Sequence, residues 1–74
     1  MSKEHHIFEF SVYNSEVRKL VQMDESHPKL DDGWAEQRYI QIRAMNEEDA
    51  TQQLRRRHPE NKGFVISSVT KFID

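Results

Sequence analysis

The sequence has no cysteine, only two glycines and two prolines, and no long apolar run among its 74 residues. Without cysteine, neither disulfides nor a thiolate zinc site can stabilise the fold, and nothing indicates an oxidising compartment. No stretch approaches the roughly 18 apolar residues of a membrane helix. A signal peptide is not expected, because the first residues include Lys3, Glu4, His5 and His6. We therefore expect a cytoplasmic protein that does not contact a membrane.

Hydrophobic residues make up 35% of the chain and charged residues 32%, with a formal net charge of −2. This composition is typical of one small globular domain covering residues 1–74. A chain of this length buries only about 60% of the surface that its unfolded form exposes. We therefore expect a core of marginal stability, which association with a partner would stabilise.

Three segments alternate between apolar and polar residues, the pattern of half-buried strands, at about 6–13, 36–44 and 63–72. In the first, Phe8, Phe10 and Val12 fall on one side. In the last, the alternation slips near Ser67, and a β-bulge there would bring Ile66 and Val69 to one face. The sequence thus predicts three strands.

Between the second and third strands, residues 47–57 carry acids in the first turn and arginines in the last, after Asn46 as N-cap. Pro59 would end this helix. For residues 15–23 we prefer a short helix capped by Asn14 or Ser15, and the alternative is an extra strand, because apolar side chains there also alternate.

These elements predict an α+β fold, a small two-layer α/β sandwich whose three-stranded mixed sheet contains a βαβ unit, with the second and third strands parallel. The expected core is Phe8, Phe10, Val12, Ile40, Ile42, Ala44, Ala50, Leu54, Ile66 and Val69. Because the main helix offers only Ala50 and Leu54 to this core, we expect one face of the sheet to stay open.

Residues 24–35 form an acidic, turn-rich segment that predicts a loop. Its acids do not follow EF-hand spacing. Adjacent His5 and His6 on a strand would point to opposite sides, which is poor geometry for chelation. A solvated loop is the preferred interpretation, and neither a metal nor another cofactor is expected.

Catalysis has little support, because the sequence has no nucleophile elbow, phosphate-binding glycine loop or His-Glu-x-x-His motif. A domain of this size also has difficulty enclosing a substrate pocket. We expect a non-enzymatic protein and assign no catalytic residue.

Basic residues suggest one binding surface. Phosphate groups could bind the candidates Arg38, Arg43, Arg55, Arg56, Arg57 and Lys62. However, three consecutive arginines fan around a helix, and their place at its carboxyl end complements the helix dipole without any ligand.

Aromatic residues suggest another surface, for which the candidates are Trp34, Tyr39, Tyr13 and Phe72. If they share the open sheet face, they form an apolar patch typical of a protein interface. For Trp34 we favour a cap on the edge of the core.

Residues 42–50 resemble the strand-to-helix junction of many small α/β proteins, including the archaeal ribosomal LX type. Each residue of this short segment has a local capping or packing role, so the resemblance implies no function.

The leading hypothesis is a small module that binds another protein or a second copy of itself, in a homodimer formed through the sheet face or an edge strand. The alternative is an RNA- or DNA-binding module that uses the arginine-rich helix end. Aromatic and arginine side chains on one surface would favour nucleic acid, and separate surfaces would favour protein.

Overall fold

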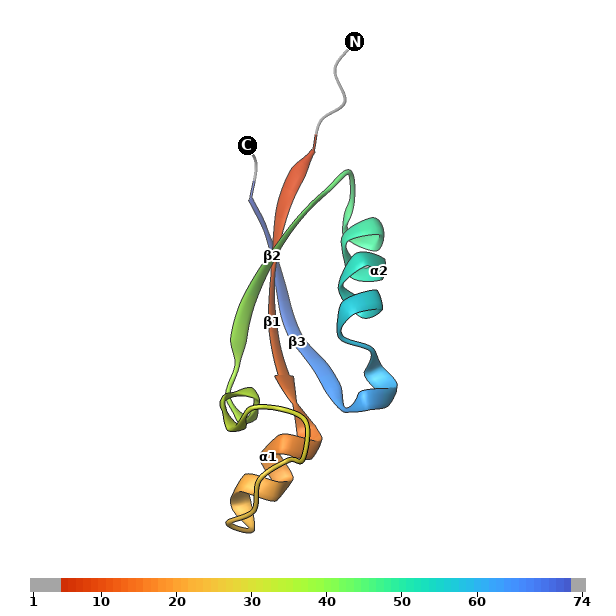
Figure 1. Cartoon of the computed structure of the whole chain (residues 1–74). Coiled ribbons are helices and arrows are strands. Elements are labelled where there is room, and N and C mark those ends of the chain that lie inside the picture. The colour runs from red at the N-terminus through yellow and green to blue at the C-terminus, as the bar shows by residue number, and fades with distance from the viewer. Residues whose placement is uncertain (1–4, 73–74) are drawn as a thin grey trace.

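A computed structural model of the chain describes residues 5–72. Its centre is a three-stranded sheet made of β1 (His6–Asn14), β2 (Arg38–Ala44) and β3 (Phe64–Phe72), in the order β2-β1-β3 (Figure 1). Strand β1 pairs antiparallel with both neighbours. Lys3 and Glu4, on which the expected absence of a signal peptide rests, lie outside the described residues.

The prediction of a mixed sheet is wrong, because both ladders are antiparallel. Strands β2 and β3 do run in the same direction, as the helical crossover between them requires, but β1 lies between them. Period-two patterns predict strands and their buried sides and carry no information about strand order. The α+β class and the two layers are as predicted.

Helix α1 (Ser15–Gln22) follows β1 directly, so the helical alternative for residues 15–23 is correct. The side chain of Asn14, which is fully buried, stabilises the turn from β1 into α1. Its Oδ1 accepts from the backbone N–H groups of Glu16 (2.9 Å) and Val17 (3.0 Å), and its Nδ2 donates to the Lys62 carbonyl (3.0 Å). One side chain therefore caps α1 and fixes the turn that precedes β3.

Helix α2 (Glu47–Arg57) has the predicted bounds. The Asn46 Oδ1 accepts from the Asp49 N–H at 2.7 Å, and the helix ends at His58, directly before Pro59. Ala50 and Leu54 are buried against the sheet, and α2 lies on one side of it (Figure 1). Capping and dipole signals therefore located this helix correctly.

The core lies between α2 and one face of the sheet. Of the ten predicted core residues, seven are buried, and Ile40, Ile66 and Val69 are partly buried and pack against them. Phe64 also belongs to this core, and Val17 of α1 is completely buried. The sequence analysis did not place these two residues in the core. Phe64 is the first residue of β3 and Val17 lies in the first turn of the short helix α1, and in both places the apolar pattern is too short to show which side chains are buried.

The predicted bulge in the last strand is confirmed. Ser11 pairs with Ser68, but the next residue, Val12, pairs with Ile66. Ser67 is thus the extra residue, and its hydroxyl lies 3.2 Å from the Ser11 Oγ. The bulge restores Ile66 and Val69 to the covered face.

A close approach at Gly63 generates the first prediction. This residue follows the 3₁₀ turn η2 (Glu60–Lys62) with φ of 96°, and a Cβ there would lie 2.8 Å from the Asn14 Oδ1. Gly63→Ala should therefore destabilise the fold by about 1–2 kcal/mol in urea unfolding. Gly33→Ala is the control, because the atoms nearest to its Cβ would be those at the flexible end of Arg38. Equal losses in the two variants would contradict this account.

The two asparagine caps give a second, matched test. Asn46→Ala removes one exposed cap, which costs about 1 kcal/mol. Asn14→Ala also leaves the Lys62 carbonyl without its donor, so we expect a loss of roughly 2–4 kcal/mol. Chemical denaturation of both variants measures the difference, and a loss at Asn14 no larger than that at Asn46 would refute the linking role.

Candidate functional site

One face of the sheet points away from α2, and we call it the open face. The register places the following residues on it: Ile7, Glu9, Ser11, Tyr13, Tyr39, Gln41, Arg43, Val65, Ser68, Thr70 and Phe72. In the described part of the chain, no helix lies across this face (Figure 1). The expectation that a single helix leaves one side of the sheet uncovered is therefore met.

Two aromatic side chains stand out on the open face. Tyr39 on β2 is 66% exposed and Phe72 on β3 is 44% exposed. Ile7 on β1 pairs with Phe72 and is partly buried. A row of polar side chains lies between the two aromatic positions, and there the Gln41 Nε2 donates to the Glu9 Oε2 at 3.2 Å. The open face therefore combines exposed aromatics with ordered polar groups, which is the usual composition of a protein interface.

Tyr13 also lies on the open face but is already covered in part. The Arg18 guanidinium of α1 stacks 3.6 Å from the centre of its ring, and the Arg18 Nε donates to the Ala35 carbonyl at 2.8 Å. This cation–π contact fixes Arg18 between α1 and η1 (Asp32–Ala35). Tyr13 is thus part of the α1 contact and is less accessible than Tyr39.

Trp34 lies apart from these three aromatics, on the covered side. Its ring packs 5.2 Å from the His58 ring and 5.1 Å from the Phe64 ring, centre to centre. Arg38 stacks over it at 4.7 Å. This arrangement matches the interpretation of Trp34 as a cap on the edge of the core.

His58 is the third ring of this aromatic cluster, with its centre 4.9 Å from that of Phe64. Burial lowers the pKa of His58 from its usual 6.5, and the nearby Arg57 charge lowers it further. The imidazole therefore stays neutral at neutral pH and acts as a third packing ring. No feature of the sequence distinguished it from the other histidines.

The basic candidates are divided between the two sides of the sheet. Arg55, Arg56 and Arg57 are exposed on α2, and Lys62 lies in η2. Arg43 lies on the open face, and the Arg38 Nη2 is 3.4 Å from the Asp31 Oδ2. The sequence prediction joined these residues as one candidate set, but they do not form one continuous surface.

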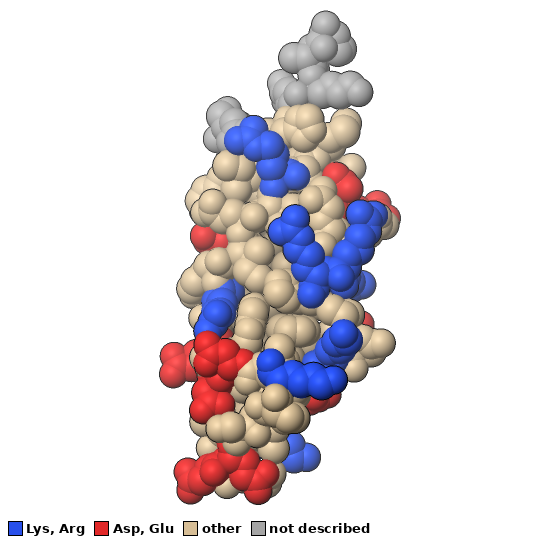
Figure 2. Space-filling model, in the orientation of Figure 1, with Lys and Arg blue, Asp and Glu red and all other residues tan. Residues whose placement is uncertain are grey.

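Acidic side chains gather at the end of the molecule that contains α1 and the following loop (Figure 2). In this loop the Asp31 side chain accepts from the Gly33 N–H. His27 accepts from the Lys29 and Leu30 N–H groups through Nδ1, and its Nε2 lies 3.5 Å from the Glu16 Oε1. The sequence analysis did not predict this role of His27 in the loop. Local polar contacts thus organise the acidic loop.

Residues 5–72 contain no group of three His, Asp or Glu side chains that could hold a metal ion. None of the helices in this range has the length and apolar character of a membrane span. The expectations of no metal and no cofactor stay predictions.

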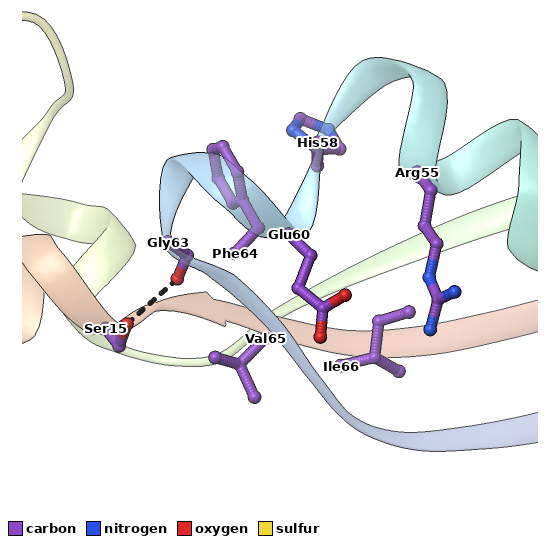
Figure 3. A pocket seen from close by; sticks show the side chains of 8 residues that line it. All are labelled: Ser15, Arg55, His58, Glu60, Gly63, Phe64, Val65 and Ile66. Atoms are coloured by element: carbon purple, nitrogen blue, oxygen red, sulfur yellow. Dashed lines mark hydrogen bonds between the residues drawn. The ribbon is translucent and has the colours of Figure 1, made fainter.

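Beside the outer strand lies a cavity of about 200 Å³, which we call the β3 groove. Its lining residues come from α2, η2, β3 and the start of α1, namely Ser15, Arg55, His58, Glu60, Gly63, Phe64, Val65 and Ile66. Figure 3 shows the Arg55 and Glu60 side chains both extending toward Ile66. The groove therefore has an apolar floor and two charged side chains above it. No sequence pattern indicated it, because it depends on how α2 and η2 approach β3.

Comparisons with protein-family models, with curated proteins and with solved structures found no match to this chain.

The lowered pKa of His58 predicts a pH dependence of stability. Because the folded-state pKa lies below the unfolded value of 6.5, neutral His58 contributes stability above pH 6.5 that is lost as the pH falls through the folded-state pKa. His58→Phe keeps the packing with Trp34 and Phe64 and cannot be protonated, so unfolding by urea should lose stability less steeply from neutral pH to about pH 5 than in the unmodified chain.

The control for this titration is His5→Phe, at an exposed position. It should keep the full pH dependence of the unmodified chain. If His58→Phe keeps that dependence as well, protonation of His58 does not contribute to acid unfolding.

Proposed function

We propose that this chain is a small, non-enzymatic interaction module whose partner is a second copy of itself, joined edge to edge through β2. The observation that carries the proposal is the exposure of Tyr39, on the open face of an outer strand of the sheet. An outer strand has unpaired backbone donors and acceptors. An exposed aromatic side chain beside them offers apolar contact area to a strand that pairs there.

The regular geometry of β2 supports its role as the pairing edge. Its register with β1 runs without interruption from Ala44 to Arg38, and the strand contains no proline, although it carries the charged residues Arg38 and Arg43. Natural sheets commonly use such residues and bulges to prevent pairing at an edge. By contrast, β3 contains the Ser67 bulge and Lys71. An added antiparallel strand therefore fits β2 over its whole length.

The sequence of β2 is also self-complementary. A two-fold axis at Gln41, the middle residue of the strand, pairs Ile40 with Ile42 of the second copy on the covered face. On the open face it places Tyr39 across from Arg43 of the second copy. The pairing would produce a continuous six-stranded antiparallel sheet with two-fold symmetry.

Nucleic-acid binding is the alternative. Tyr39 lies on the open face, whereas Arg55, Arg56 and Arg57 lie on α2, which packs on the opposite face, and this separation weighs against it. Trp34 does lie on the α2 side, beside Arg38 and His58, but its ring packs against the core. Sequence-tolerant nucleic-acid sites combine stacking aromatics and cations along one groove. A gel shift at low salt tests this alternative, and binding there would displace the self-association proposal. The cytoplasmic location stays a prediction.

Single cysteines offer a clean test of the pairing edge, because the chain has no cysteine of its own. Gln41 and Thr70 lie in the same cross-strand row of the open face, on β2 and β3 respectively, with Glu9 between them. Around the proposed axis, the two Cα atoms of residue 41 would be roughly 4.5–5.5 Å apart, within the reach of a disulfide. We expect Gln41→Cys to form a disulfide-linked dimer on mild oxidation and Thr70→Cys to stay largely monomeric.

Sedimentation of the unmodified chain over a concentration series completes the test. It should show a monomer–dimer equilibrium, and Tyr39→Ser should shift that equilibrium toward monomer by roughly fivefold or more. A monomer at every concentration, or cross-linking at Thr70 and not at Gln41, would contradict pairing through β2.

A further inference from the structure

The β3 groove opens on the outer edge of the sheet. Val65 faces the open side with Tyr13, and Ile66 faces the covered side with Val12. Both line the groove, although they point to opposite faces. A cavity that touches both faces of one strand must lie along the edge of that strand, so the groove gives access to the backbone of β3 (Figure 3).

The phase of the β1–β3 ladder determines which backbone groups face the groove. The Ser15 N–H donates to the Gly63 carbonyl at 2.8 Å, and Asn14 pairs with Phe64. In an antiparallel ladder this bond flanks a non-hydrogen-bonded pair, so the N–H and C=O of Phe64 point away from β1. Two residues later the same holds for Ile66. The groove therefore presents two residues with backbone donors and acceptors directed outward.

The charged side chains that line the groove are Arg55 and Glu60. Arg56, Arg57 and Lys62 are close to them in sequence and add positive charge nearby, whereas Glu16 lies against Gly63 of the lining. Within the described residues, neither Arg55 nor Glu60 has an ion-pair partner, although both side chains extend into the groove (Figure 3). An incoming acidic side chain would meet the Arg55 guanidinium over the apolar surface of Ile66.

We propose that the β3 groove binds an extended acidic peptide segment as a fourth strand. Its backbone pairs with Phe64 and Ile66, and its acidic side chain pairs with Arg55. The bulge at Ser67 ends this short docking edge, so only a short segment can be added. This site lies on the sheet edge opposite β2 and is independent of the self-association proposed above.

The test uses two synthetic peptides with blocked ends, Thr-Val-Glu-Val-Thr and the matched Thr-Val-Gln-Val-Thr. Binding is followed by the backbone amide NMR signals of residues 64–68 and by the fluorescence of Trp34, which packs against Phe64 and His58 of the groove lining. We expect the glutamate peptide to shift these signals and to bind roughly fivefold more tightly than the glutamine peptide at low salt.

Two charge-reversal variants separate a groove contact from general attraction. Arg55→Glu should abolish the preference for the glutamate peptide, whereas Arg56→Glu, at a neighbouring exposed residue that does not line the groove, should retain it. Both variants keep the helix and the core, because neither side chain is buried.

Three results would overturn the proposal. They are the absence of shifts in residues 64–68 at millimolar peptide, equal effects of the two variants, and shifts confined to residues 39–43. The last result would move the peptide to β2. Because the proposed pairing through β2 is measured by sedimentation without any peptide, failure of one proposal leaves the other intact.

Discussion

The fold depends on the buried side chain of Asn14. Its amide connects the end of β1, the first turn of α1 and the Lys62 carbonyl before β3, which is 48 residues away in sequence. The backbone bond from Ser15 to the Gly63 carbonyl closes the same junction. This junction sets the register with which β3 begins. The position of Phe64 in the core and the orientation of the β3 edge both follow from it, because a one-residue shift would turn every side chain to the other face.

A second constraint is that one short helix must cover a three-stranded sheet. Only Ala50 and Leu54 of α2 are buried, so the helix shields the covered face and contributes nothing to the other side. At the end that α2 does not reach, the aromatic cluster of Trp34, His58 and Phe64 completes the core. His58 must stay neutral to pack there, which agrees with its lowered pKa. The open face keeps its aromatics because residues 5–72 place no further helix on it.

Local signals in the sequence were sufficient to predict the helices and strands but not how they are arranged in space. Asn46, the acids after it and Pro59 gave the bounds of α2, and the slip in alternation near Ser67 gave the bulge, because caps and pleats act over a few residues. The insertion of β1 between β2 and β3 could not be predicted, since strand order depends on contacts between distant segments. For the same reason the grouping of Trp34 with His58, and the β3 groove itself, had no sequence signal. Of the four aromatic candidates, the strand residues Tyr13, Tyr39 and Phe72 could be assigned to one face by alternation, whereas Trp34 in the loop could not.

The two outer strands differ in regularity, and the two proposals assign them separate uses. Strand β2 is regular and carries Tyr39, so a long partner strand can pair along it. Strand β3 is interrupted at Ser67, and residues of α2 and η2 line the β3 groove beside its beginning. A bulge limits pairing beyond it, because the partner backbone loses its ladder there. In the proposed binding mode, the same irregularity would limit an added strand to a short edge of β3 before the bulge. A central strand with two dissimilar edges allows a chain this small to present two distinct surfaces without a second domain.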